Sequence, residues 1–110
     1  MAYIEAMIFI ETPVFTRQII ALVDDDDYAE LQRELANNPE AGDVIAGTGG
    51  LRKIRMAAKG HGKRGGARVI YYYFSCASQI ALLLAYAKNE AENLTTAQKK
   101  ALKLVIELWR

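Results

Sequence analysis

The residues with the clearest chemical potential form a basic block in the middle of the chain. Between Val44 and Asn89 there are eight basic residues and no aspartate or glutamate, whereas ten of the thirteen acidic residues precede position 44. Basic residues interleaved with glycine and aromatic neighbours are typical of a phosphate-binding surface. A solvated charged face is the alternative reading, and the lack of compensating acids over this stretch argues against it.

The spacing of these cations predicts that several of them share one face of a β-sheet. In residues 51–56 charged and apolar residues alternate, so Lys53 and Arg55 point to the face opposite Ile54 and Met56. The next strand carries Arg68, and Lys88 follows the last strand. The same stretches also contain Tyr72, Tyr86 and Glu90.

Such a face could support RNA chemistry. Arginines clamp a phosphate at two points and stabilise charge that develops on it. A lysine crowded by other cations can serve as a base, and exposed aromatic rings can stack on an unpaired base. RNA supplies its own nucleophile, the 2′-OH, so a cationic sheet could promote cleavage without a metal or other cofactor. The spacing alone does not separate a nuclease from a simple RNA binder.

The remaining composition excludes several other chemistries. The single histidine, His61, rules out a two-histidine ribonuclease pair within a monomer. From its glycine-rich loop it could reach a phosphate or a base, and a passive role is the alternative. Cys76 is the single cysteine, which excludes an internal disulfide, and no Cys or His spacing indicates a zinc site. The glycine-rich segment 42–50 contains no GKS or GKT and is therefore not a Walker loop.

The periodicity predicts one α+β domain over residues 1–110, in the order β-α-α-β-β-β-α. We expect a small, mostly antiparallel four-stranded sheet, with two N-terminal helices and a C-terminal helix packed on one face. The expected strands are residues 3–10, 51–56, 67–74 and 79–87, and the last is apolar enough to be central. The segment 42–50 is expected to be a connection without regular structure.

Capping residues mark where the helices should begin. Thr12-Pro13 has the pattern of an N-cap followed by proline at the first helical position. The run Asp24–Asp27 should open a second helix, with carboxylates capping its free N–H groups, and Asn37-Asn38-Pro39 should stop it. Thr95 and Gln98 have the spacing of a capping box. The apolar side of the final helix is expected to consist of Leu102, Val105, Ile106 and Trp109.

No targeting signal is evident. No apolar run reaches the roughly 18 residues that a membrane helix needs, and the start, Met-Ala-Tyr-Ile-Glu, lacks the basic and apolar regions of a secretory signal. We therefore expect a cytoplasmic protein that does not associate with membranes.

Several blocks together resemble HigB-type toxins of the RelE superfamily. These blocks are Gly42-Asp43-Val44-Ile45, Gly47-Thr48-Gly49-Gly50-Leu51-Arg52-Lys53-Ile54-Arg55, Gly62-Lys63-Arg64-Gly65-Gly66, Arg68-Val69-Ile70-Tyr71-Tyr72 and Tyr86-Ala87-Lys88-Asn89-Glu90. They occur in order through nearly the whole chain. The resemblance implies a toxin of a type II toxin–antitoxin system that enters the A site of the 30S ribosomal subunit and cleaves mRNA during translation.

The resemblance also implies roles for individual residues. Lys53 and Arg55 match the paired basic strand positions, and Arg68 matches the arginine that grips the scissile phosphate. RelE has an arginine where this chain has Asn89, and a catalytic tyrosine near its C-terminus that this chain lacks. We therefore expect Lys88, with Tyr86 and Glu90, to perform the acid–base work. The RNA-binding residues are expected to be Arg52, Lys59, His61, Lys63, Arg64 and Tyr72.

The implied partners are mRNA on the ribosome and a cognate antitoxin with a helix-turn-helix domain, through which alone the toxin would reach operator DNA. One alternative is a ParE-like inhibitor of DNA gyrase, and another is a non-catalytic RNA- or protein-binding module. The basic strand residues argue against the gyrase inhibitor, because a gyrase binder has no need of them. The intact basic cluster argues less strongly against the binding module, for instance a decayed toxin.

Overall fold

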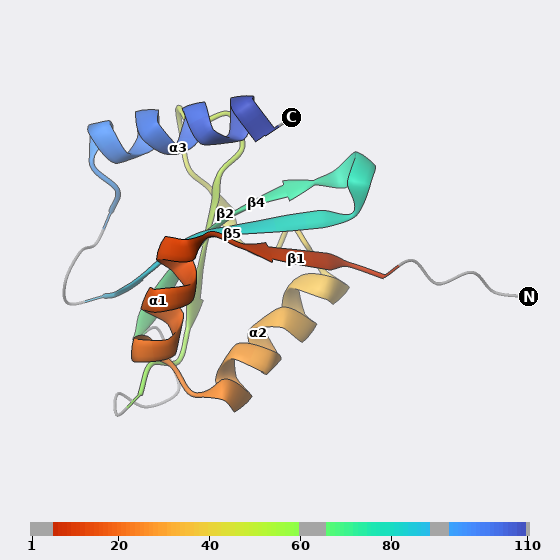
Figure 1. Ribbon diagram of the computed structural model, residues 1–110, viewed down its shortest axis with the longest axis vertical. Helices are drawn as coiled ribbons and strands as arrows, with labels where there is room; N and C mark the ends of the chain where they lie inside the picture. The colour runs from red at the N-terminus through yellow and green to blue at the C-terminus, as the bar shows by residue number, and fades with distance from the viewer. Residues whose placement is uncertain (1–5, 60–65, 89–92, 110) are drawn as a thin grey trace, which may run out of the picture.

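The computed structural model describes residues 6–59, 66–88 and 93–109. Figure 1 shows how its helices and strands are arranged. In chain order they are β1 (Ile8–Glu11), α1 (Pro13–Leu22), α2 (Asp25–Asn37), β2 (Asp43–Val44), β3 (Arg52–Met56), β4 (Ala67–Phe74), the short 3₁₀ helix η1 (Ser75–Ala77), β5 (Gln79–Ala87) and α3 (Thr96–Trp109).

The strands form one mixed sheet in the order β1-β5-β4-β3-β2. The α+β class is confirmed, but the expectation of four mostly antiparallel strands is corrected in two respects. Asp43–Val44 adds a fifth strand antiparallel to β3, within a segment expected to be irregular. In addition, β1 pairs with β5 in parallel. The interior position of β5 is confirmed, because it lies between β1 and β4.

The helices cover both faces of the sheet rather than one (Figure 1). On one face, α1 and α2 pack through Phe15, Ile19 and Leu35 against alternate residues of β3, β4 and β5. On the other face, Ile106 of α3 packs with Leu51, Ala81 and Leu83. The expectation of a single helical layer is wrong because β4 and β5 have buried apolar residues on both faces, which require a cover on each side.

Polar side chains of the α1 segment satisfy backbone groups of β5 beyond the short β1. The pairing between β4 and β5 shifts its register at Ile70 and Tyr71. Near this shift, the Thr12 hydroxyl donates to the carbonyl oxygen of Leu83 at 2.9 Å. The Gln18 side-chain oxygen accepts from the N–H of Ala85 at 2.8 Å. These contacts attach α1 to the edge of β5, where a strand partner ends.

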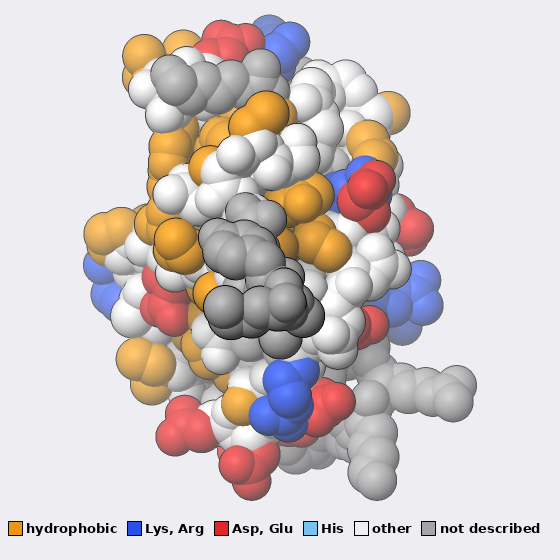
Figure 2. Space-filling model, turned by 90° about the vertical axis from the view of Figure 1, so that its right-hand side faces the viewer, with side chains coloured by type: hydrophobic (Ala, Val, Ile, Leu, Met, Phe, Trp, Pro, Cys, Tyr) orange, Lys and Arg blue, Asp and Glu red, His pale blue; other side chains and the backbone are white. Residues whose placement is uncertain are grey.

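The caps agree with the predictions at two of three helices. Thr12 accepts the N–H of Phe15, and Thr95 and Gln98 exchange the two hydrogen bonds of a capping box. The predicted start and end of α2 are confirmed, but Asp24 at its N-cap makes no side-chain capping bond. The acidic run instead places charge near the positive end of the helix. Red carboxylate side chains gather at the bottom of Figure 2, where α2 begins.

The outer side of α3 differs from the prediction. Ile106 is buried and Leu102 and Trp109 are partly buried, as expected for an inward face. Val105 is instead 41% exposed, together with Leu104 and Leu108. This helix has apolar residues on both sides, so periodicity alone could not identify the side that packs on the sheet.

Across the described part of the chain, none of the helices combines the length and the apolar character that crossing a membrane would require.

Candidate active site

A row of functional side chains crosses three strands of the sheet. Arg55 of β3 is the direct register partner of Arg68 of β4, and Arg68 is in turn the partner of Tyr86 of β5. Directly paired residues of an antiparallel ladder point to the same face with their Cβ atoms about 5 Å apart. Strand alternation therefore places two arginines and a tyrosine side by side, as the sequence predicted.

Lys53 and Lys88 lie on the same face on either side of this row. Lys53 pairs with Ile70, two residues along β3 from Arg55, and its Nζ donates to the side-chain oxygen of Asn93 at 3.1 Å. Lys88 directly follows β5, is exposed, and donates its backbone N–H to Gly66 at 3.1 Å. We call the surface formed by Lys53, Arg55, Arg68 and Lys88 the cation face. It brings together four predicted catalytic cations from β3, β4 and the end of β5.

A cavity of about 370 Å³ opens beside this row. It is lined by Glu34, Ala41, Gly42, Asp43, Lys53, Ile54, Arg55 and Arg68. The cavity exists because β2 is only two residues long and pairs with Arg52 and Lys53 alone. Among the residues that the structure describes, no strand pairs with this edge of β3 beyond Lys53, and the loop before β2 forms the facing wall.

The two arginines differ in exposure. Arg55 is exposed, whereas Arg68 is only 5% exposed although it lines the cavity. One guanidinium nitrogen of Arg68 donates to the carbonyl oxygen of Ala67 at 3.2 Å, which helps to fix its orientation. A guanidinium keeps its charge when buried and can offer donors to two phosphate oxygens. A phosphate in the cavity would meet the anchored guanidinium of Arg68 and the exposed guanidinium of Arg55.

Tyr71 fixes the loop before β2, which forms one wall of the cavity. Its buried hydroxyl donates to Pro39 at 2.8 Å and accepts the N–H of Gly42 at 2.9 Å. Burial raises the pKa of the Tyr71 phenol, so the hydroxyl stays protonated and can donate. A Cβ atom on Gly42 would lie 2.8 Å from the Tyr71 ring, so this close approach requires a glycine. Tyr71 thus fixes where the chain enters β2.

Arg52 belongs to this wall rather than to the cation face. It is the register partner of Tyr71 and donates to the carbonyl oxygens of Glu40 and Gly42 at 3.2 and 2.8 Å. It also forms an ion pair with the Glu40 carboxylate at 3.2 Å. The structure therefore separates Arg52 from Lys53 and Arg55, because strand alternation turns it to the opposite face of β3.

The turn between β2 and β3 explains part of the glycine-rich block. Buried Thr48 donates its hydroxyl to Ile45 at 2.5 Å and accepts the N–H of Leu51 at 3.2 Å. Gly50 adopts φ 115°, a conformation that side-chain-bearing residues rarely adopt. A Cβ there would approach the Tyr72 ring to 3.2 Å. These residues shape the hairpin that carries Lys53 and Arg55.

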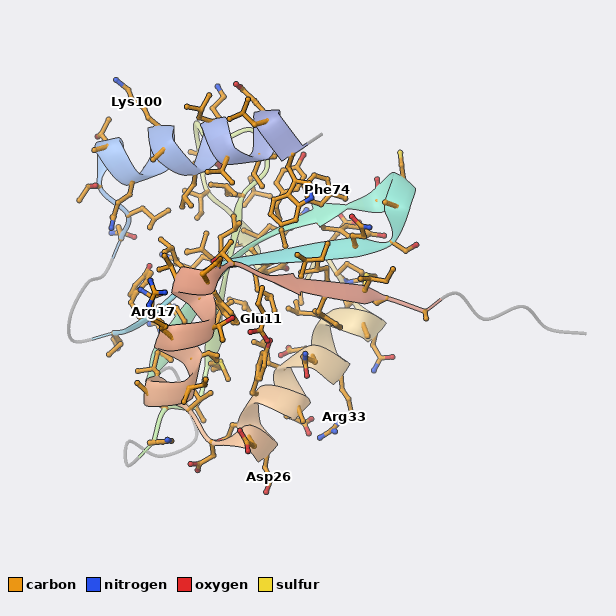
Figure 3. The ribbon with its side chains drawn as sticks, in the orientation of Figure 1. Glu11, Arg17, Asp26, Arg33, Phe74 and Lys100 are labelled. Atoms are coloured by element: carbon orange, nitrogen blue, oxygen red, sulfur yellow. The ribbon has the colours of Figure 1, made fainter. Side chains whose placement is uncertain are left out.

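Two further predicted RNA-binding residues lie away from the cavity. Lys59 donates its Nζ to Ile20 at 3.1 Å and its backbone N–H to Leu22 at 2.9 Å, which satisfies carbonyls at the end of α1. Tyr72 packs against Phe74, with ring centroids 4.7 Å apart, beneath α3. Phe74 is visible between α3 and the strands in Figure 3.

Four predicted residues fall outside the described residues. They are His61, Lys63 and Arg64 in the basic loop, and Glu90 after β5.

Sequence reasoning missed the acidic members of the cavity. Asp43 lies on β2 as the register partner of Lys53, and Glu34 reaches the cavity from α2. Asp43 stands next to the basic block in the quoted Gly-Asp-Val-Ile motif. However, a segment read as an irregular connection gives no sheet register. Among the described residues, no group of three or more His, Cys, Asp or Glu side chains could hold a metal ion.

Comparison with known proteins agrees with this geometry. Residues 15–109 match the family model described as the RelE toxin of the RelE / RelB toxin-antitoxin system. A similar solved structure is that of the E. coli toxin RelE in the free state, in a mutant with two arginines replaced by alanine. The TM-score is 0.57 over 80% of this chain and 90% of that chain, and the sequence identity is 11%. At this identity, the structural likeness establishes the fold alone.

Proposed function

This chain belongs to the RelE toxin family, and we propose that it is a ribosome-dependent mRNA endoribonuclease that cuts translated mRNA in the ribosomal A site. The observation that supports this activity best is the register of Arg55 and Arg68 across β3 and β4, next to Lys53 and a cavity of about 370 Å³. A purely protein-binding toxin would not need three cations around one cavity. Cleavage of this kind would inhibit translation.

In the proposed mechanism, the cation face aligns the scissile phosphate for attack by the neighbouring 2′-OH. Arg68 grips one side of the phosphate from its anchored position, while Arg55 and Lys53 bind the other side. Their fixed positive charges stabilise the additional negative charge of the pentavalent transition state. RNA brings its own nucleophile, so the proposed reaction requires alignment, a base, an acid and charge stabilisation, without a metal.

We assign the acid–base work to the end of β5. Tyr86 shares the row with Arg68, and Lys88 follows on the same face. Glu90 remains part of the proposed set from the sequence alone. The remaining RNA contacts are proposed for the basic loop residues His61, Lys63 and Arg64, which would extend the phosphate-binding surface along the message.

The family also supports a partner. We propose a cognate antitoxin that neutralises this toxin and carries a helix-turn-helix domain, so that operator DNA is bound through the antitoxin. Both proteins would act in the cytoplasm, where translated mRNA is found.

In vitro translation of a defined mRNA tests the activity directly. Purified protein is added with and without ribosomes, and new 5′ ends are mapped by primer extension. We expect cuts within the reading frame that depend on ribosomes and are lost with Arg68→Ala. Arg33→Ala is the matched control, because Arg33 is an exposed arginine on α2 that pairs only with Glu30 among the described residues. Circular dichroism checks that each variant is folded.

Intact mRNA in the presence of folded wild-type protein would contradict the proposal. A supercoiling assay with DNA gyrase would then test the ParE-like alternative.

A further inference from the structure

Two carboxylates line the cavity, and Asp43 is the one that lies on a β-strand. β2 pairs Asp43 directly with Lys53, which places both side chains on the face that carries Arg55 and Arg68. All four residues line the cavity. The other carboxylate there, Glu34, comes from a helix packed on the opposite face. Asp43 therefore belongs to the cation face by register, although it belongs to the acidic part of the chain by sequence.

The Asp43 side chain has no evident structural task. It is exposed, and no hydrogen bond or ion pair joins its carboxylate to another described residue. Its backbone is nevertheless well fixed. On one side, Gly42 bonds to Tyr71 and Arg52, and on the other side the N–H of Ile45 donates to Leu51 at 2.8 Å. A carboxylate with no partner is thus held in place beside three cations.

The chemistry of the cavity gives this carboxylate a specific role. Lysine and arginine side chains in their charged forms donate hydrogen bonds and accept none, whereas an ionised carboxylate only accepts. On the cation face of the cavity, the described side chains that could bind phosphate are all donors. The proton of an attacking 2′-OH needs an acceptor, and Asp43 supplies it.

We propose that Asp43 is the general base of the RNA cleavage, an inference that rests on the proposed function. The carboxylate takes the proton of the 2′-OH as the 2′-oxygen forms a bond to phosphorus. The bond from phosphorus to the 5′-oxygen breaks, and that oxygen takes a proton from Lys88, one of the residues at the end of β5 to which the proposed function gives acid–base work. Asp43 thus takes over the role of the base, and the end of β5 keeps the role of the acid. The products are a 2′,3′-cyclic phosphate and a 5′-hydroxyl end.

The position of Asp43 in the sheet suits a base that acts on the side of the phosphate opposite the acid. In-line displacement puts the attacking and leaving oxygens on opposite sides of phosphorus, so the base and the acid must approach from opposite sides. Asp43 lies on β2 and Lys88 follows β5, with β3 and β4 between them. The arginine pair that would hold the phosphate belongs to the two middle strands.

The test is Asp43→Asn, which keeps the size of the side chain and removes its ability to take a proton. We expect single-turnover cleavage on the ribosome to fall roughly 10²- to 10⁴-fold, the usual contribution of general acid–base catalysis. Ribosome-bound affinity for an mRNA with a 2′-deoxy nucleotide at the cut site should change less than about threefold, because that probe lacks the proton to be removed. Asp43→Glu should restore part of the rate.

The pH dependence distinguishes a base from a side chain that merely shapes the cavity. A general base gives wild-type cleavage a rising limb with increasing pH, and Asp43→Asn should flatten that limb. Asp26→Asn is the control for residue type, because Asp26 lies in the first turn of α2, away from the cavity (Figure 3). It should cleave like the wild type.

Two results would overturn the inference. One is Asp43→Asn cleavage within about twofold of wild type while Arg68→Ala is inactive, which would leave the proposed nuclease function standing. The other is a loss with Glu34→Gln in place of Asp43→Asn, which would assign the base to α2. No cleavage by wild-type protein would remove both the inference and the function on which it rests.

Discussion

One face of the sheet is apolar and covered at one end and cationic at the other. At one end, Ala81 and Leu83 lie beneath Ile106 of α3 in an apolar cluster that excludes water. At the other end, Arg68 of β4 lines the cavity and pairs with Tyr86 of β5. The covered end contributes stability through burial, and the cationic end holds like charges together at an electrostatic cost. The comparison teaches that burial of apolar side chains at one end of this face can offset the repulsion between the cations at the other end.

The outer side of α3 carries both apolar and charged side chains (Figures 2 and 3). Orange hydrophobic side chains reach the surface at the top of Figure 2, at the level of α3. Lys100 points away from the sheet on the outer side of α3 (Figure 3). Lys100 is exposed there, so it is a solvated charge and not part of the cation face. Four predictions test how independent the two ends are, and they run from the largest expected effect to the smallest.

Arg55→Ala should affect the cationic end alone. Arg55 is exposed, so its removal leaves no core cavity. Loss of one preorganised donor to a transition state costs roughly 10²- to 10³-fold in rate. We expect a decrease of that size in ribosome-dependent mRNA cleavage, with a thermal midpoint close to that of the wild type. A thermal midpoint that falls along with the rate would show that the two ends are coupled.

Ile106→Ala should affect the covered end alone. Ile106 is 3% exposed, and truncation of a buried isoleucine to alanine costs about 2–5 kcal/mol of unfolding free energy. Urea denaturation measures the loss. At a temperature where the variant is folded, cleavage per molecule should stay near the wild-type rate. Leu104→Ala, on the exposed side of the same helix, is the control and should cost far less.

Gly42→Ala should lower both the unfolding free energy and the rate of mRNA cleavage. The new methyl group would lie 2.8 Å from the Tyr71 ring and must displace either the ring or the loop. Overpacking of this kind typically costs about 1–3 kcal/mol. Because the loop positions Asp43 and lines the cavity, cleavage should fall even under conditions where the variant is fully folded. Full cleavage by the folded variant would show that the wall tolerates movement.

Thr95→Ala should have the smallest effect. It removes the acceptor for the N–H of Gln98 at the start of α3, and loss of such a cap costs about 1 kcal/mol. A small decrease in the urea midpoint is expected, without a change in cleavage rate. Thr96→Ala is the neighbouring control, because Thr96 is exposed and makes no capping bond among the described residues.

Features that depend on neighbouring residues were predicted correctly from short sequence patterns. The alternation in residues 51–56 placed Lys53 and Arg55 on one face, and the structure confirms it. The Thr12 N-cap and the Thr95 capping box were also predicted correctly, because each depends on residues within one helical turn. Interactions over such short distances are encoded where they occur.

Longer-range features were not available from local pattern. Arg52 belongs to the same basic block as Lys53, yet its neighbours across the sheet make it part of the cavity wall. Lys59 was predicted to bind RNA but lies against the end of α1, a contact between residues almost forty positions apart in sequence. Charge type alone cannot distinguish a ligand-binding cation from one that satisfies backbone carbonyls.

The sequence by itself determined four of the five strands, the helix starts and the shared face of Lys53 and Arg55, because these follow from periodicity, capping and alternation. Only the tertiary structure decided that α3 covers the face opposite α1 and α2, and that Asp43 stands beside Lys53. The reason is physical. Strand register and helix docking are fixed by contacts between segments distant in sequence, and one two-residue strand is too short to leave a periodic signal.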